Sequence, residues 1–335
     1  MRRGLLAVVA LLLGLALPAP AAATPSTHNH ADAAAGWLAR QMADGERIEV
    51  DFGGVRYPSQ GMTIDAVFAF AAARTADDYA DRAIAWLARP DVTTGYVGAD
   101  GEAYAGAHAK LMLAAQVAGK DPAAFGGVDL DAGLRALLTP SGRFSDVSAF
   151  GDYSNAFSQS LALLALDRTA AGVPGSAVDF LVGTQCPDGG FPLDLAATPC
   201  VSDVDSTAMV TQALQAVGRH GRAQQGLSWL VGVQHADGGF GIGVSNANST
   251  GLAGQALKAG GRLFAAHRAK QLLVGLQVGC SGPVEQRGAI AYQATGADPA
   301  TMVKATTQGV LGLAGRPLFR LHSGGTADAP VLACP

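Results

Sequence analysis

Apolar residues recur at helical spacing along most of the chain, in two alternating types of segment. The first type carries a bulky apolar stripe, and an apolar stripe with three- and four-residue spacing predicts an amphipathic helix. Its six copies are centred on Trp37, Trp86, Ala136, Phe180, Trp229 and Gln271, so the steps between them are 49, 50, 44, 49 and 42 residues. A recurring period of this size predicts a repeat architecture.

The second type of segment is rich in alanine, glycine and glutamine, and one copy follows each copy of the first. Small residues allow helices to pack closely, which favours an inner layer for this type. Two copies open with Asp or Asn before Ser-Thr, whose side-chain oxygens can accept hydrogen bonds from the free N–H groups of a first helical turn. The predicted inner helices begin near Asp65, Ala105, Asn155, Asp205, Asn248 and Ala305.

Glycine-rich turns separate the two types of helix. Asp188-Gly-Gly-Phe191 and Asp237-Gly-Gly-Phe240 are near copies of one turn, and Gly95-Tyr96 and Gly142-Arg-Phe144 are interpreted as degenerate versions. Glycine permits the positive φ that such turns need. Few strands are expected, because no alternating pattern persists. Six helical hairpins in series fit both an open solenoid and a closed ring.

The first residues predict export. Arg2 and Arg3 precede an uninterrupted apolar run, Gly4 to Leu17, and small residues follow at positions 21–23. This is typical of a signal peptide, residues 1–23. The run is shorter than the roughly 20 residues of a spanning helix, and no later stretch is long and apolar enough. We therefore expect a secreted, extracellular protein with no membrane span after cleavage.

Composition and cysteines refine this prediction. Half of the chain is hydrophobic (49%), which allows a large core, and the formal net charge of −4 gives no basic footprint for nucleic acid. Four cysteines in an exported chain predict two disulfides. Of three possible pairings we favour Cys186–Cys200 and Cys280–Cys334, the second pinning a C-terminal tail, residues 316–335, to a domain of residues 24–315. A metal site is disfavoured, because no Cys-x-x-Cys is present.

Two motifs resemble those of a known superfamily. Gln185-x3-Gly189-x-Phe191 and Gln234-x3-Gly238-x-Phe240 resemble the QW repeat of terpene cyclases and protein prenyltransferase β subunits. Asp203-Val-Asp205-Ser-Thr-Ala resembles the Asp-x-Asp-Asp-Thr-Ala motif of squalene–hopene cyclases. The nearest resemblance is to secreted bacterial prenyltransferase/squalene-oxidase repeat proteins. It implies an all-α fold, the (α/α)6 toroid of six helical hairpins, and so a closed ring.

The resemblance also implies a candidate acid. In class II cyclases the residue matching Asp205 protonates an alkene, with the residue matching Asp203 beside it. This sequence has Ser206 where the family has a further carboxylate, and only 6% of its residues are aromatic, although cyclases use aromatic rings to stabilise cations. The alternative is that Asp203, Asp205 and Ser206 cap a helix. Whether the protein is an enzyme, terpene cyclase- or prenyltransferase-like, stays open at this point.

Other polar residues are candidates for a ligand site. His108 and Lys110 share the second inner helix and are expected to face the cavity as a polar pair. Glutamines recur on the inner helices, either as ligand contacts or as helix-to-helix hydrogen bonds; they are Gln159, Gln212, Gln255 and Gln308.

Two further clusters suggest metals, and both have a simpler interpretation. Asp77-Asp78-x-x-Asp81 spells a magnesium–diphosphate motif, but acidic residues in the first turn of an outer helix complement its dipole. His28 and His30 lie at the start of the mature chain, where disorder is expected. No metal site and no cofactor is predicted.

Together these observations favour a secreted toroid that binds a small apolar ligand, or an extracellular protein partner, through its central cavity or rim. The alternative is a class II terpene-cyclase-like enzyme with Asp205 as general acid. A third possibility is a scaffold whose ring is filled by side chains. No nucleic-acid partner is expected.

Overall fold

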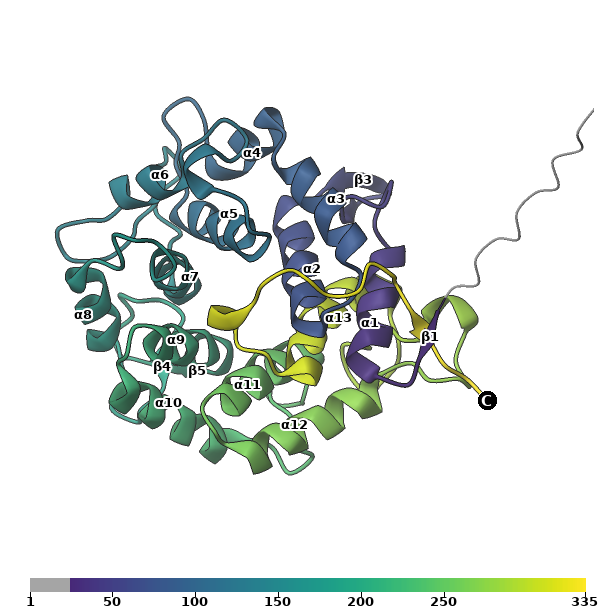
Figure 1. Ribbon diagram of the computed structural model, residues 1–335. Coiled ribbons are helices and arrows are strands. Elements are labelled where there is room, and N and C mark those ends of the chain that lie inside the picture. Colours follow the sequence, from purple (N-terminus) through teal and green to yellow (C-terminus); the bar gives the residue numbers. More distant parts are fainter. Residues whose placement is uncertain (1–24) are drawn as a thin grey trace, which may run out of the picture.

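The computed structural model describes residues 25–335, so the predicted signal peptide lies outside the described residues. Figure 1 looks down the axis of a ring with two concentric layers of helices. The inner helices are α2 (Gln60–Ala73), α5 (Ala105–Val117), α7 (Ala156–Leu166), α9 (Val204–Ala216), α11 (Ala247–Ala259) and α13 (Pro299–Ala314). The outer helices are α1 (His30–Arg40), α3 (Asp77–Leu87), α6 (Leu130–Ala136), α8 (Gly175–Gly183), α10 (His220–Val233) and α12 (Leu263–Leu276).

The ring is closed. Each inner helix packs against the next one along the chain, and α13 packs against both α11 and α2, which joins the last repeat to the first. An additional short helix, α4 (Pro90–Val97), follows α3. The expected all-α toroid of six hairpins is confirmed, and the prediction of a ring rather than an open solenoid with it.

Strands are few and short in the described chain, as expected. β2 (Glu49–Phe52) and β3 (Val55–Pro58) form an antiparallel hairpin. β4 (Phe191–Pro192) and β5 (Ser202–Asp203) pair antiparallel just before α9. β1 (Ser26–Thr27) pairs in parallel with β6 (Val331–Leu332), which brings the start of the described chain to its end.

The inner helices lie close together because glycine and alanine occupy their contacts. At Gly251 in α11, a Cβ atom would collide with the backbone carbonyl of Gln308 in α13. Any larger residue would force these two helices apart, so the small-residue composition of the inner layer is a packing requirement.

Three details of the sequence prediction were wrong. α2 and α13 begin at Gln60 and Pro299, five or six residues before the expected starts, because Ser59 and Asp298 cap them. Gly95 and Tyr96 are not a turn but lie inside α4, which begins with a proline at its first position.

The third error concerns the residues around His30. Asn29 caps α1 by accepting the N–H groups of Ala31 and Asp32, and the His30 imidazole contacts the amide oxygen of Gln277 at 2.5 Å. This segment is therefore ordered, because it is a helix start packed against the loop after α12.

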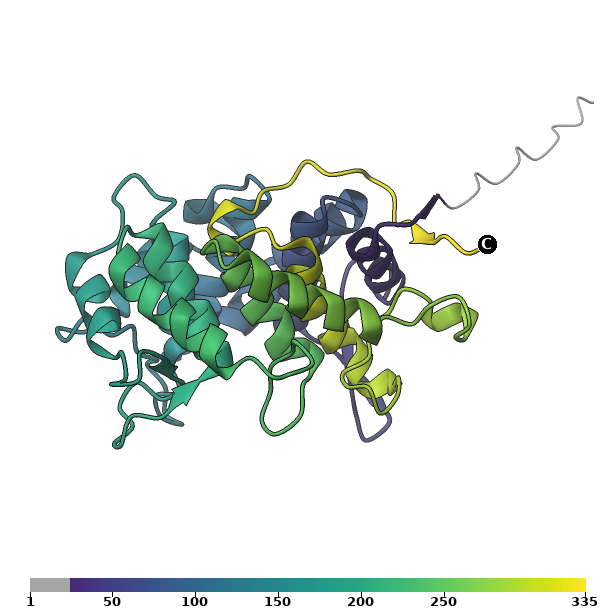
Figure 2. The same ribbon diagram turned by 90° about the horizontal axis from the view of Figure 1, so that it is seen from below.

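Both favoured disulfides are present, Cys186–Cys200 and Cys280–Cys334, each with a Cα–Cα distance of 5.6 Å. The C-terminal tail runs from Gly315 across the end of the ring where the inner helices finish, here called the tail end. Figure 2 shows the tail at this end and β4 and β5 at the opposite, mouth end, where the inner helices begin. None of the helices in residues 25–335 is long and apolar enough to cross a membrane.

Candidate functional site

One repeated hydrogen bond sets the register of the inner helices. In five repeats of the described chain, a buried backbone N–H ahead of the inner helix donates to a side-chain oxygen on that helix, at 2.9 Å each time. The acceptors are Thr63, Gln159, Thr207, Thr250 and Thr306. Successive helical residues are turned by about 100°, so the residue two positions further on faces the other way, toward the ring axis.

The residues at these axial positions line a central cavity of about 280 Å³. This volume lies just below the roughly 300–1,000 Å³ of typical small-molecule sites. Each inner helix of the described chain contributes one such residue: Asp65, Lys110, Leu161, Met209, Leu252 and Gln308.

The cavity has two unlike walls. Phe68 of α2 and Leu311 of α13 extend the apolar wall made by the axial leucines and methionine, and Leu318 of the tail completes it. Asp65, Lys110 and Tyr96 form the titratable part of the lining, here called the polar wall. The uncharged polar residues that also line the cavity are Asn155, Ser158, Thr307 and Gln308. Such a combination of apolar surface and a few convergent polar groups is typical of a ligand site.

An ion pair dominates the polar wall. The Lys110 ammonium lies 2.7 Å from the Asp65 carboxylate and donates a second hydrogen bond to the backbone carbonyl of Gly61, at 2.9 Å. Burial alone would lower the pKa of Lys110, but the charge of Asp65, with a smaller contribution from Tyr96, outweighs it and raises that pKa. Lys110 is therefore charged at neutral pH, and the pair is neutral as a whole.

Tyr96 reaches this ion pair from α4. Burial raises the pKa of its phenol, with Lys110 opposing and Asp65 adding to the shift, so the hydroxyl keeps its proton at neutral pH. Within the part of the chain that the structure describes, the hydroxyl has no hydrogen-bond partner. A Cβ atom at Gly61 would lie 3.7 Å from the Tyr96 oxygen and 3.9 Å from the Lys110 nitrogen, so both groups converge above this glycine.

His108 and Lys110 do not face the cavity together. The His108 ring packs toward the outer layer, where its Nε2 would lie 2.7 Å from a Cβ atom at Gly133 of α6. Its Nδ1 contacts the carbonyl of Tyr104 at 3.0 Å, and burial lowers its pKa despite that contact. The reason is helical geometry, since a spacing of two residues places side chains on opposite faces.

Three of the four glutamines, Gln159, Gln212 and Gln255, are fully buried and serve the packing, whereas Gln308 lines the central cavity. Gln159 accepts from the N–H of Phe144 and donates to the carbonyl of Gly142, both at 2.9 Å. The Gln212 amide donates to the Gln255 amide oxygen at 3.1 Å and accepts from the N–H of Leu318 in the tail. Gln255 donates to the carbonyl of Arg316. Their role as ligand contacts stays a prediction, whereas their helix-to-helix hydrogen bonds are explicit.

Asp203 and Asp205 line a different pocket, of about 640 Å³, at the mouth end. Asp203 caps α9, because its carboxylate accepts the N–H of Ser206 at 2.8 Å. Asp205 lies within the first turn of the same helix and does not cap it. Neither residue lines the central cavity. The capping interpretation thus holds for Asp203 alone.

Asp205 is the more unusual carboxyl of the two. One of its oxygens, Oδ1, is buried without a hydrogen-bond partner in the described chain. Burial is the main reason that its pKa is raised; Asp203 adds to the shift, and a hydrogen bond with Ser249 and the charge of Lys304 oppose it. A carboxyl in such a place tends to hold a proton, as a general acid must.

The next repeat has an uncharged residue at the same position. Asn246-Ala-Asn248-Ser-Thr in α11 aligns with Asp203-Val-Asp205-Ser-Thr in α9, and Asn246 caps α11 as Asp203 caps α9. Asn248 also has a buried oxygen without a partner among the described residues. In both repeats one side-chain oxygen at this position is buried, and of the two helices only α9 has a carboxyl there.

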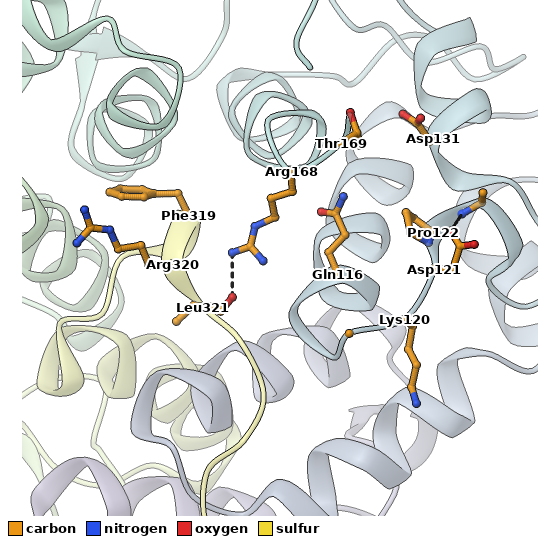
Figure 3. A pocket seen from close by; sticks show the side chains of 12 residues that line it. Gln116, Lys120, Asp121, Pro122, Asp131, Arg168, Thr169, Phe319, Arg320 and Leu321 are labelled. Carbon is orange, nitrogen blue, oxygen red and sulfur yellow. Dashed lines mark hydrogen bonds between the residues drawn. The ribbon is translucent and has the colours of Figure 1, made fainter. Parts of the chain in front are cut away.

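A third pocket, of about 670 Å³, lies at the tail end. Figure 3 shows Arg168 extending from the end of α7 toward the tail, with Gln116 of α5 on the other side. Arg168 donates to the carbonyls of Leu318 and Leu321, both at 2.9 Å, and burial lowers its pKa although Asp167 opposes this. Arg168 therefore fastens the tail where Leu318 enters the cavity wall.

Asp77, the first residue of the acidic motif that resembles a magnesium–diphosphate site, has a structural role. Asp77 begins α3, and its carboxylate accepts the N–H groups of Gly324 and Gly325 in the tail, at 2.8 and 2.5 Å. The expected helix start is confirmed, and this carboxylate also holds the tail.

Sequence reasoning missed Asp65 and Tyr96 as site residues. Asp65 was named from the sequence, but only as the start of an inner helix, whereas it lies inside α2. Tyr96 was assigned to a turn, because the second repeat departs from the glycine-turn pattern. The signal that would have found Asp65 is its position two residues after Thr63, which matches Met209 after Thr207 and Leu252 after Thr250.

No protein-family profile matches the sequence, and no curated protein matches it in a sequence comparison. Solved structures do match. The type II terpene cyclase MstE from Scytonema superposes with a TM-score of 0.66 at 15% identity, covering 85% of this chain and 97% of that one. An ent-copalyl diphosphate synthase from Streptomyces platensis gives 0.52 at 18% identity, covering 78% of this chain and 53% of that one, so this chain spans about half its length.

A glycosidase variant matches as well, with a TM-score of 0.58 at 13% identity, covering 87% of this chain and 97% of that one. At these identities the likeness concerns the fold. The chain thus has the α/α toroid fold of the terpenoid cyclases, and because proteins with different chemistry share it, function must be argued from the site.

Proposed function

We propose that this protein is secreted and binds a small, largely apolar molecule in its central cavity. The observation that supports this is the cavity itself, which all the inner helices line and whose wall is mostly apolar. The predicted signal peptide and the two disulfides favour export to an oxidising compartment.

The volume limits the ligand. About 280 Å³ corresponds to roughly nine water molecules at about 30 Å³ each, and so to a ligand of about ten heavy atoms. An MstE variant has been solved in complex with geranylgeranyl dihydroxybenzoate, its substrate. An apolar ligand is in keeping with that neighbour, and a cavity of about 280 Å³ favours a molecule smaller than that substrate.

Native mass spectrometry of the exported protein tests the proposal by detecting a carried molecule. Leu252→Trp fills the cavity and should abolish the added mass. Val231→Trp, the matched control on the exposed side of α10, should retain it. An exported protein that carries no molecule and gains none from small apolar probes would contradict the proposal.

Catalysis is a second candidate function, with Asp205 as the general acid of a cyclase-like reaction. The raised pKa of Asp205 and its partnerless oxygen favour it. Protonation of an alkene would start cyclisation of a polyprene in the mouth pocket. Asp205→Asn should then abolish product formation in gas chromatography of a polyprene incubation, whereas a binding protein would be unaffected.

A protein partner on the mouth rim is a third candidate. Loops at this end expose large apolar side chains, including Phe150, Tyr153, Ile242 and Val244. Ile242→Lys with Val244→Lys should prevent capture of such a partner from the extracellular fraction and leave the carried ligand in place. Capture that is unchanged by these substitutions would argue against the rim.

A further inference from the structure

We infer that the central cavity selects an apolar molecule with an uncharged, oxygen-bearing head group, such as an alcohol, a phenol or a ketone, held by Tyr96 and Lys110. This inference rests on the proposed function, since it names the class of ligand for the same cavity. It follows from the charge, the free hydrogen-bonding groups and the shape of the polar wall.

The charge of the polar wall disfavours an ionic ligand. Lys110 and Asp65 neutralise each other at 2.7 Å. A carboxylate near Lys110 would also lie near the Asp65 carboxylate, and an ammonium near Asp65 would also lie near Lys110. Either ion would have to leave water without a net opposite charge to receive it.

The free hydrogen-bonding groups disfavour a hydrocarbon. An ammonium has three donors, and Lys110 uses two of them, for Asp65 and for the carbonyl of Gly61. The Tyr96 hydroxyl, a donor and an acceptor, has no partner in residues 25–335. A hydrocarbon would displace water from both groups without replacing its hydrogen bonds, whereas a hydroxyl or carbonyl group would replace them.

The Tyr96 hydroxyl and the Lys110 ammonium lie close enough together to contact a single head group. Tyr96 and Lys110 come from α4 and α5, and they converge above Gly61, whose missing side chain leaves the space between them open. The same cavity is lined by Leu161, Met209 and Leu252, which would contact the apolar body of the ligand. One oxygen atom can therefore meet both groups while the carbon skeleton stays on the apolar wall.

Four probes with similar skeletons test the inference on the mature, exported chain: 2-phenylethanol, ethylbenzene, phenylacetate and 2-phenylethylamine. Isothermal titration calorimetry at pH 7 should show that 2-phenylethanol binds about tenfold more tightly than each of the others, the cost of one or two missing hydrogen bonds or one unpaired charge. Tyr96→Phe should reduce its advantage over ethylbenzene to about twofold. Tyr153→Phe, the same change on an exposed loop, should leave that advantage intact.

Two variants should change which of the four probes binds most tightly. Asp65→Asn leaves Lys110 unpaired, so phenylacetate should become the preferred probe. Lys110→Gln leaves Asp65 unpaired, so 2-phenylethylamine should become preferred. Circular dichroism of each variant shows whether it is folded. If a charge variant does not fold, Tyr96→Phe still tests the inference, because it removes only one hydroxyl group that faces the cavity.

The outcomes separate the inference from the proposed function. Equal affinity for 2-phenylethanol and ethylbenzene, or tighter binding of either charged probe by the unsubstituted protein, would overturn the inference and leave apolar binding standing. Absence of binding by all four probes, together with no carried molecule, would overturn both. Binding that Leu252→Trp does not weaken would place the probes elsewhere and overturn the inference as well.

Discussion

At the scale of single residues, the most informative contrast is between two carboxyls with opposite pKa shifts. Burial raises the pKa of Asp205. Asp188 lies in the turn before β4, and although burial opposes it, hydrogen bonds from Ser202, the N–H of Gly190 and the Trp229 indole lower its pKa. The folded state therefore favours a protonated Asp205 and an ionised Asp188.

Asp205→Asn should increase the free energy of unfolding at pH 7. A carboxyl whose pKa is raised on folding destabilises the folded state progressively as the pH rises above 3.8, its ordinary value, until the raised pKa is passed. The gain in the free energy of unfolding should therefore shrink on acidification and vanish below pH 3.8, where the carboxyl is protonated in both states. Urea unfolding at a series of pH values measures it.

Asp188→Asn is the matched control, and its sign should be opposite. A carboxyl with a lowered pKa stabilises the folded state above its ordinary pKa, and this contribution is lost as the pH falls through the lowered value. The variant should be less stable than the parent at neutral pH, and the difference should close in acid. Losses of similar size for both variants at pH 7 would show that Asp205 is structural.

Sequence reasoning identified residues whose role is local and missed those whose role depends on packing. Asp203 as a helix cap and the pairing of Cys186 with Cys200 follow from chain neighbours. Lys110 was placed correctly at the cavity, but His108 was not, since the position of a helix face relative to the ring axis had not been fixed. Tyr96 was out of reach, because α4 is an insertion that the repeat does not contain.

At the scale of elements, the bond between each turn and its inner helix fixes which residues face the axis. Thr207 accepts the buried N–H of Phe191 at 2.9 Å. Thr207→Val keeps the shape and removes the acceptor, so it should destabilise the protein by about 1–3 kcal/mol, the cost of an unpaired buried amide. Thermal unfolding measures this loss. Thr94→Val in α4, where the structure gives no side-chain hydrogen bond within the described residues, should change stability by about 0.5 kcal/mol or less.

Inner and outer helices should respond in opposite ways to the same substitution. Gly251→Ala in α11 would press against the Gln308 carbonyl of α13 and should cost about 1–3 kcal/mol, as overpacking does. Gly275→Ala in α12 meets no atom within 4 Å and should stabilise the protein by about 0.5–1 kcal/mol through helix propensity. Chemical denaturation of both variants checks this, and a loss at position 275 would contradict the two-layer packing.

The existence of these elements was readable from the sequence, and their limits were less so. The apolar stripes placed all outer helices, and the small residues identified the inner layer. The starts of α2 and α13 were misplaced, because their caps, Ser59 and Asp298, stand ahead of the segments that resemble the other repeats. A cap depends on a few local contacts that differ from one repeat to the next, so the repeat pattern does not show where each helix begins.

At the scale of the whole molecule, the repeat period alone did not predict that the ring closes. A step of 42 to 50 residues fits a solenoid equally well, and the resemblance to toroid families decided the matter. The contact of α13 with α2 closes the ring. The tail then crosses it, held by Arg168, by Asp77 and by the pairing of β6 with β1. The cysteine near the C-terminus predicted that a disulfide holds the tail to the ring. It did not predict that Leu318 forms part of the cavity wall.

The two disulfides should therefore differ in function more than in stability. By loop length, Cys280–Cys334, with a sequence separation of 54, should contribute about 4 kcal/mol, and Cys186–Cys200, with a separation of 14, about 3 kcal/mol. Replacing Cys280 and Cys334 by serine should release the tail, increase hydrogen exchange at the N–H of Leu318, and accelerate dissociation of 2-phenylethanol. Replacing Cys186 and Cys200 should lower the melting temperature without either change. Equal dissociation rates in the two variants would show that the tail covers the ring without closing the cavity.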